Sequence, residues 1–273
     1  MQQQCFKSSE AKTHFCKYGY IIIPNAIQED VLLSIKKLSD FFENDVRDKF
    51  LYSTMACNVE DNLKIHHQVL ELLTPFLSSV LDNYKTFSST FLIKPAKGEE
   101  MDLHQDWSFT NEQEYQAMTL WLPLHDVSEK NGSVFILPQS HLYYRNKRSD
   151  SLPTARIKRS NFNHHIVTIQ LKKGDVLFFN PAVFHGSHAN SSNEHRRIIT
   201  MTILPQDAPF IYYNKLSERY VEALLLEPDA FLKQMKIFNE NGGGIKGKRI
   251  GKIKYKHFVP TQKSVLRNAN LNR

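Results

Sequence analysis

The sequence lacks an apolar run long enough to cross a membrane. A membrane-spanning helix needs about 20 consecutive apolar residues, and the longest candidate, Tyr20-Ile21-Ile22-Ile23, ends at Pro24. The opening residues MQQQCFKSSEAK have no apolar core behind a basic start, so we expect no secretory signal there. The sequence therefore predicts no association with a membrane.

Cysteine is scarce in this chain of 273 residues. The three cysteines, Cys5, Cys16 and Cys57, are an odd number and lie far apart. This pattern fits neither a disulfide framework nor a zinc cluster. We therefore expect a reducing compartment and a cytoplasmic location.

Acidic residues are missing from the C-terminal end. Residues 242–273 hold nine of the 35 Lys and Arg residues and no Asp or Glu, which leaves 26 basic against 28 acidic side chains in residues 1–241. We predict a basic C-terminal tail over 242–273, joined by a glycine hinge at Gly242-Gly243-Gly244. Such a tail could bind nucleic acid or anionic lipid, or be a solvated, partly disordered end.

The spacing of apolar residues changes along the chain. Residues 28–44 carry one apolar stripe of a helix, and residues 63–83 do the same with an interruption at Pro75. From residue 86 onward, short β-prone runs alternate with turns and no helix lies between them, which indicates an antiparallel sandwich or barrel. The runs are FSSTFLIKP, AMTLWLPLHDV, SVFILP, HIVTIQL, DVLFFN and RRIITMTILP.

Turn signals and a last helical segment complete the predicted organisation. Asn131-Gly132, between two apolar runs, predicts a hairpin, and Lys173-Gly174 and Asn180-Pro181 predict further turns. We predict one mostly β domain with flanking helices over residues 1–241. It has a helical N-terminal part, a β-sandwich core at about 86–205 and C-terminal helices at about 215–240.

The segment His104-Gln105-Asp106 carries a metal-binding pattern. In extended backbone, residues two apart project to the same face, so His104 and Asp106 point together and Gln105 points away. A second histidine would complete a two-His, one-carboxylate face with open positions, as non-haem iron(II) oxygen chemistry requires. His185 follows a strand and an aromatic run, and His188 is an alternative three residues further on.

Arg196 follows His185 by eleven residues, at the start of the run RRIITMTILP. Its planar guanidinium suits a dicarboxylate, because it binds a carboxylate through two parallel hydrogen bonds. In a strand, residues 196, 198, 200 and 202 share one face, and Arg197 lies on the other. Only one of the two arginines can therefore point inward, and a buried arginine needs an anionic partner.

These blocks resemble the phytanoyl-CoA dioxygenase family of iron(II)- and 2-oxoglutarate-dependent oxygenases. The resemblance rests on four stretches between residues 18 and 202: YGYIIIPN from Tyr18, HQD from His104, NGSVFILPQSH from Asn131, and the stretch from Gly174 through His185 and Asn190 to Arg196. Gln139 departs from the pattern, because the family usually has glycine there. We expect that difference to alter a turn and not the chemistry.

The resemblance implies a fold and a set of roles. The fold is a double-stranded β-helix, a jelly-roll or cupin-like sandwich, and the domain at 1–241 would be one oxygenase domain. His104, Asp106 and His185 would hold Fe(2+), with His185 favoured over His188 by the step to Arg196. Arg196 would bind the distal carboxylate of 2-oxoglutarate, helped by the Ser187 hydroxyl, and Trp121 would wall that pocket.

The expected reaction is oxidation of a small-molecule substrate. O2 and 2-oxoglutarate would give succinate and CO2 while an unactivated C–H bond is hydroxylated. Halogenases related to this family replace the carboxylate ligand with a small residue, so the presence of Asp106 favours hydroxylation or a related oxidation. Residues 141–164 form a candidate lid for an anionic substrate or a solvated basic loop; the basic residues are Arg145, Lys147, Arg148, Arg156, Lys158 and Arg159.

Three alternatives remain open. A cupin-type metal enzyme that uses no 2-oxoglutarate would not need Arg196. A nucleic-acid demethylase would need a basic groove on the body, which the balance of charge in residues 1–241 argues against. A non-catalytic binding protein on the same fold is the third. The sequence carries no signal for an oligomeric state.

Overall fold

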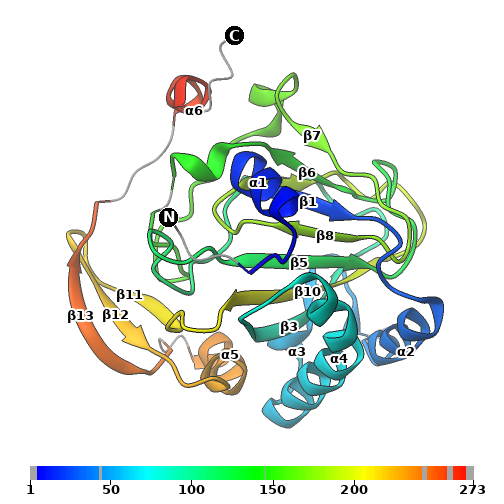
Figure 1. The fold of residues 1–273 in the computed structure, drawn as a ribbon, viewed down its shortest axis with the longest axis horizontal. Coiled ribbons are helices and arrows are strands. Elements are labelled where there is room, and N and C mark those ends of the chain that lie inside the picture. The colour runs from blue at the N-terminus through cyan, green and yellow to red at the C-terminus, as the bar shows by residue number, and fades with distance from the viewer. Residues whose placement is uncertain (1–4, 43–44, 145, 242–244, 257–260, 269–273) are drawn as a thin grey trace.

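Two antiparallel sheets form the centre of the computed structural model, which describes residues 5–42, 45–144, 146–241, 245–256 and 261–268 (Figure 1). The larger sheet has six strands in the order β1 (Tyr20–Ile23), β8 (Val176–Phe179), β5 (Met118–Pro123), β10 (Arg196–Pro205), β3 (Tyr84–Lys94) and β2 (Leu51–Tyr52). The smaller sheet has the order β4 (Met101–His104), β9 (Phe184–Ser187), β6 (Val134–Leu137) and β7 (Val167–Thr168). The two sheets form the predicted jelly-roll sandwich with flanking helices.

Alternation along the strands separates two apolar cores. On β10, Ile199, Met201 and Ile203 belong to one buried cluster, whereas Ile198 belongs to another that also contains Trp121 of β5. This division confirms the predicted two faces of β10, because side chains alternate along a strand. The second cluster also draws on β6 of the smaller sheet, so it lies between the sheets.

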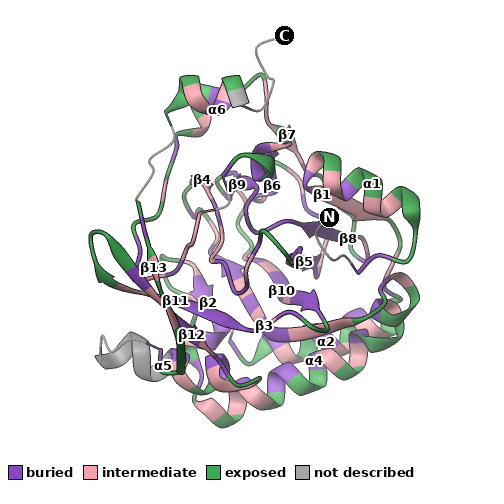
Figure 2. Ribbon diagram, turned by 60° about the vertical axis from the view of Figure 1, so that its left-hand side comes forward, coloured by how far each residue is buried: buried purple, intermediate pink, exposed green. Residues whose placement is uncertain are grey.

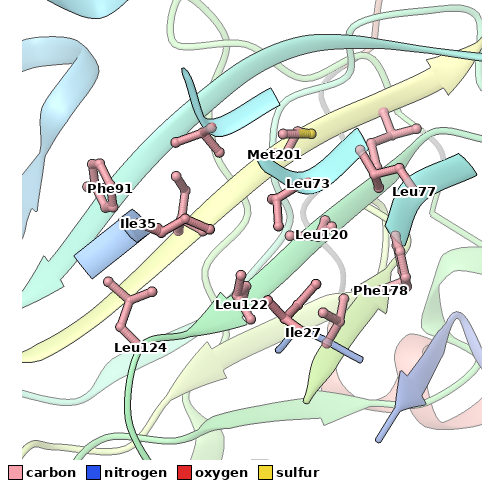
Figure 3. Packing of buried hydrophobic residues seen from close by; sticks show 14 of the residues in the cluster. Ile27, Ile35, Leu73, Leu77, Phe91, Leu120, Leu122, Leu124, Phe178 and Met201 are labelled. Atoms are coloured by element: carbon pink, nitrogen blue, oxygen red, sulfur yellow. The ribbon is translucent and has the colours of Figure 1, made fainter. Parts of the chain in front are cut away.

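Helices cover the outer face of the larger sheet (Figure 1). α2 (Glu29–Asp40) and α4 (Val59–Val80) confirm the predicted helices, and their side chains pack against β5, β8 and β10 (Figure 3). The central strands are buried on both faces (Figure 2), and every residue of β5 is buried. α1 (Ser9–Tyr18) and α3 (Ser53–Ala56) complete the N-terminal helices, and two 3-10 turns follow at Ser140–Leu142 and Arg159–Phe162.

The predicted interruption at Pro75 is wrong, because α4 continues through this proline. A proline inside a helix removes one backbone hydrogen bond and costs roughly 3 kcal/mol. Leu73 and Leu77, on either side of it, are fully buried in the cluster beneath the helix. Their burial offsets that cost, since fully burying a leucine stabilises by roughly 1.5–3 kcal/mol.

The Asn131-Gly132 turn forms, but the predicted hairpin does not. Gly132 has φ 88°, in the left-handed region, and the Asn131 side chain accepts a hydrogen bond from the Ser128 backbone N–H at 2.8 Å. The strands on either side enter different sheets, because β5 pairs with β8 and β10 whereas β6 pairs with β7 and β9. The turn residues therefore predicted the local turn correctly, but they do not encode which strands the flanking segments pair with.

The prediction of helices over 215–240 is wrong in its first half. β11 (Ile211–Ser217) and β12 (Tyr220–Leu225) form a hairpin, and only α5 (Ala230–Asn241) is helical. β13 (Lys248–Lys254) pairs with β12, so this part of the predicted tail is a strand of a third sheet. Val221 and Ala223 are buried in that sheet's apolar cluster, and this tertiary pairing overrides the helix propensity of Glu, Ala and Leu.

The last described helix of the predicted tail is also packed. α6 (Gln262–Asn268) buries Val265 completely in the cluster that also contains Leu103 and Ile157. The predicted hinge at 242–244 lies outside the described residues. Over the described part of the chain, none of the helices has the length and apolar character needed to span a membrane.

Candidate metal centre

Pairing of β4 with β9 brings the metal-binding pattern together. His104 and His185 are register partners, and Asp106 follows two residues after the end of β4. Asp106 Oδ1 lies 3.5 Å from His185 Nε2 and 4.0 Å from His104 Nε2. One ligand atom from each of the three residues lies within 4.8 Å of the others. The geometry is that of a facial two-His, one-carboxylate set.

Both imidazoles are oriented by the backbone. His104 Nδ1 lies 2.9 Å from the Asp102 carbonyl, and His185 Nδ1 lies 3.0 Å from the Val183 carbonyl. A carbonyl can only accept, so each Nδ1 carries the proton and donates it. Each Nε2 therefore faces Asp106, and once it has lost any proton it can bind a metal, as in metal-binding histidines with an outer hydrogen-bond partner.

The charges of the three groups match metal binding. Burial, followed by the nearby His185, lowers the pKa of His104 to about 4, so its imidazole is neutral near pH 7. Burial would raise the pKa of Asp106, but the charge of His185, a hydrogen bond from His185 and the charges of His104 and Arg148 together lower it and keep this carboxyl ionised. Burial would likewise lower the pKa of His185, but the adjacent Asp106 carboxylate raises it. A bound cation would take the place of the His185 proton.

Asp106 is held by groups from distant parts of the chain. Its N–H donates to the Pro181 carbonyl at 2.9 Å, and its own carbonyl accepts from Arg148 Nε at 2.6 Å. Arg148 also forms a two-point ion pair with Glu112, at 2.7 and 2.9 Å. Gln105 points away from the metal ligands, as predicted, and donates to the Tyr144 carbonyl at 2.7 Å.

Arg196 is the second notable feature of the space between the sheets. It is 1% exposed, and it donates from one terminal nitrogen to the Gly132 carbonyl at 2.7 Å. Its Nε is buried without a hydrogen-bond partner, and no described carboxylate forms an ion pair with it. The guanidinium carbon lies 5.5 Å from the Trp121 ring centroid. Burial lowers the pKa of Arg196 to about 10, so the side chain remains charged at neutral pH.

Lys94 adds a second buried cation beside Arg196. The two are register partners on β3 and β10, and Lys94 is fully buried. Its ammonium donates to the carbonyls of His188 and Ser187, the latter at 3.4 Å. Burial, followed by the charge of Arg196, lowers the pKa of Lys94 to about 7. Two adjacent buried cations without a described acidic partner make this end of the interior suited to an anion.

The other predicted site residues take distinct places. Ser187 is buried two residues after His185, on the same face of β9. His188 lies outside the triad, where its Nε2 is 3.1 Å from the Thr168 hydroxyl and its Nδ1 is 3.6 Å from Glu129. Gln139 adopts φ 67°, in the left-handed region that glycine occupies freely, which fits its place in a turn.

Sequence reasoning missed Lys94, Tyr52 and the role of Arg148. Lys94 ends an ordinary β-prone run before a proline, so its sequence context gives no sign of burial. Burial and the charge of Asp106 raise the pKa of the Tyr52 phenol, while the charge of Arg196 opposes that rise. In the sequence, Arg148 lies in a basic loop and nothing nearby identifies its partner. The fold brings Glu112 to it.

Comparison with known proteins identifies the family. The family model described as Phytanoyl-CoA dioxygenase (PhyH) matches residues 15–198, more than half of the chain. The chain belongs to this family, as its four sequence blocks predicted.

Two curated relatives illustrate how far the similarity extends. The chain is 30% identical over 157 residues to the "Probable alpha-ketoglutarate-dependent hypophosphite dioxygenase" of Stutzerimonas stutzeri, across 54% of each protein. It is 25% identical over 164 residues to the peroxisomal phytanoyl-CoA dioxygenase of Bos taurus, across 54% of this chain and 48% of the bovine protein. The chain spans about half the length of the curated relatives it matches.

Solved structures share the fold. The non-heme alpha ketoglutarate dependent carbocyclase SnoK from nogalamycin biosynthesis superposes with a TM-score of 0.55 and 20% identity, across 74% of this chain and 86% of SnoK. EctD from S. alaskensis with bound Fe gives a TM-score of 0.52 and 17% identity, across 75% of this chain and 79% of EctD. At these identities the likeness establishes the jelly-roll architecture.

Proposed function

We propose that this protein is an iron(II)- and 2-oxoglutarate-dependent dioxygenase that hydroxylates a small-molecule substrate. His104, Asp106 and His185 would hold the iron. One observation carries the proposal: a buried arginine with an unpartnered Nε shares the interior with a converging two-His, one-carboxylate set. Membership of the phytanoyl-CoA dioxygenase family agrees with it.

The residues present fit the cosubstrate as well as the metal. Arg196 would bind the distal carboxylate of 2-oxoglutarate, because a guanidinium binds a carboxylate at two points and the buried Nε needs an acceptor. Lys94, beside it, adds positive charge. Trp121 packs near the guanidinium and limits its movement, and Ser187, on the face of β9 that carries His185, would donate its hydroxyl.

The chain's own residues position and protect the reaction. Iron(II) bound with 2-oxoglutarate and O2 would supply oxidative decarboxylation to succinate and CO2, coupled to hydroxylation of a C–H bond. The Asp102 and Val183 carbonyls orient the two imidazoles, and Arg148 holds the backbone of Asp106. Buried apolar side chains such as Phe179, whose ring centroid lies 4.6 Å from that of His185, exclude water.

A titration under anaerobic conditions tests the proposal. Iron(II) and 2-oxoglutarate are added while the weak visible charge-transfer band of the chelate, at roughly 500–530 nm, is recorded. We expect a band in the wild-type protein, no band in His185→Ala, and a far higher 2-oxoglutarate requirement in Arg196→Ala.

Two neighbouring residues supply matched controls. His188→Ala removes a buried histidine outside the triad, and Arg197→Ala removes an arginine on the opposite face of β10 that pairs with Asp40 at 2.9 Å. Both variants should keep the band at wild-type cosubstrate concentrations. Folded, iron-loaded wild-type protein that gives no band would overturn the 2-oxoglutarate assignment and favour a cupin-type enzyme or a binding protein.

A further inference from the structure

The basic residues of the 141–164 loop differ in whether they have a partner. Arg148 pairs with Glu112, and Arg159 Nε pairs with Glu100 at 2.8 Å. Arg156 is exposed, and within the described parts of the chain it forms no hydrogen bond or ion pair. Of these three arginines, only Arg156 therefore keeps a guanidinium available to a ligand.

The backbone places Arg156 beside the strand that carries His104. Leu103 and Ile157 form an antiparallel bridge in which each N–H donates to the other carbonyl, at 3.0 and 2.9 Å. The bridge is isolated, but its antiparallel register puts Arg156 across from His104, and directly opposite residues project to the same face. Leu103 and Ile157 are buried in the cluster behind the smaller sheet, so in extended backbone their neighbours His104 and Arg156 lie on the opposite face, where His104 is partly buried and Arg156 is exposed.

The charge of Arg156 acts on groups of the candidate site. Burial and the charge of Asp106 raise the pKa of the Tyr52 phenol, and Arg196 and then Arg156 oppose that rise. Arg156 thus lies within electrostatic range of the same phenol as Arg196. The two arginines approach it differently, because Arg196 is buried between the sheets and Arg156 is exposed on the loop.

We propose that Arg156 binds an anionic group of the substrate, a carboxylate or phosphate, and so holds the substrate beside the metal centre. This inference rests on the proposed function, in which Arg196 is already occupied by 2-oxoglutarate. A guanidinium suits this role, because its fork binds two oxyanion oxygens at once and fixes orientation as well as distance. The substrate class is then small organic acids or phosphate esters.

Paramagnetic relaxation of small probe molecules tests this inference, and it does not require the natural substrate to be known. The protein is loaded with Mn(II) in place of iron and saturated with 2-oxoglutarate. The methyl proton relaxation of propionate, methyl phosphate, propionamide and propylammonium is then measured, because Mn(II) accelerates the relaxation of nearby protons. Zn(II)-loaded protein gives the diamagnetic background.

The expected pattern depends on charge and on Arg156. The two anions should show about tenfold stronger enhancement than propionamide, as for one charge-assisted hydrogen-bonded pair. Arg156→Ala should reduce the relaxation enhancement of the two anions to that of propionamide. Arg156→Lys should restore part of the difference between the anions and propionamide. Arg156→Glu should favour propylammonium instead. Lys158→Ala is the matched control, because this exposed cation of the same loop lies on the Asp102 side of the Leu103–Ile157 bridge and not on the His104 side.

Three outcomes would overturn the inference. The first is equal relaxation enhancement of neutral and anionic probes in the wild type. The second is a preference for anions that survives in Arg156→Ala. The third is a loss of that preference in Lys158→Ala as large as the loss in Arg156→Ala. Survival in Arg156→Ala would mean that the anion binds the metal or Arg196 directly. Failure of the proposed function has a separate sign, since the iron(II)–2-oxoglutarate band would then be missing in the wild type. A band without an anion preference rejects only the substrate class.

Discussion

Replacing Arg148 with methionine should destabilise the fold and loosen the metal centre together. The Arg148 and Glu112 side chains are 10% and 8% exposed, and two hydrogen bonds join them. Removing one partner of such a buried pair costs roughly 3–5 kcal/mol, because it leaves a charge in a poorly solvated place. For a chain of 273 residues, this loss corresponds to a fall in Tm of roughly 5–9 °C.

The same substitution removes the Arg148 hydrogen bond to the Asp106 carbonyl. Apparent iron(II) affinity should therefore fall as well, while the far-UV circular dichroism spectrum stays close to that of the wild type. Thermal unfolding followed by circular dichroism measures the first effect, and titration with iron(II) in the presence of a competing chelator measures the second.

Two comparison variants make the reasoning refutable. Arg159→Met breaks a pair with Glu100 in which the side chains are 29% and 33% exposed, and it should cost no more than about 1 kcal/mol. The double variant Arg148→Met/Glu112→Leu removes both buried charges, so it should be more stable than Arg148→Met alone. Equal effects of Arg148→Met and Arg159→Met, or additive losses in the double variant, would contradict the assignment of a buried pair.

Three further predictions concern other parts of the framework. The pKa of Lys94 is about 7 in the folded protein and about 10.4 when unfolded, so the unfolded chain binds more protons between these values. The free energy of unfolding should rise with pH in that window, and denaturation at pH 7 and 9 should show Lys94→Met abolishing that part of the rise. Gly186→Ala would place a Cβ against the backbone carbonyl of Met101 on β4 and 2.6 Å from the Phe135 ring, so β4 and β9 should separate and iron(II) titration should show a large loss of affinity. Val265→Asp puts a charge into the cluster behind the smaller sheet and should weaken iron binding, whereas Lys263→Asp, on the exposed side of α6, should not.

Local patterns predicted the strands of the two central sheets well. The alternation Arg196, Ile198, Thr200 on one face and Arg197, Ile199 on the other is a property of extended backbone, and it holds in the structure. Arg197 accordingly reaches Asp40 of α2 on the outer face, at 2.9 Å. A period of two is strict in strands, so such predictions survive without knowledge of the partners.

Predictions that depended on competition between local and distant partners were wrong. Residues 215–225 contain good helix formers, yet they form strands because β11 and β13 flank β12 on its two sides. Pairing across two neighbours and burial of Val221 outweigh propensity differences of less than about 1 kcal/mol per residue. The basic residues 248–254 were also wrongly predicted to be part of a tail. A run of basic residues indicates solvent exposure, but it carries no information about strand pairing.

The sequence by itself determined the chemical types at the candidate centre and the face to which each projects. The spacing of His104 and Asp106, and the alternation that puts Arg196 and Arg197 on opposite faces, follow from backbone geometry over a few residues. Only the tertiary structure decided which distant residues meet these: His185 opposite His104 through β4 and β9, Lys94 beside Arg196, and Arg156 at the loop bridge. Such meetings depend on how strands pair across the whole chain, and local propensities of a few tenths of a kcal/mol do not encode that choice.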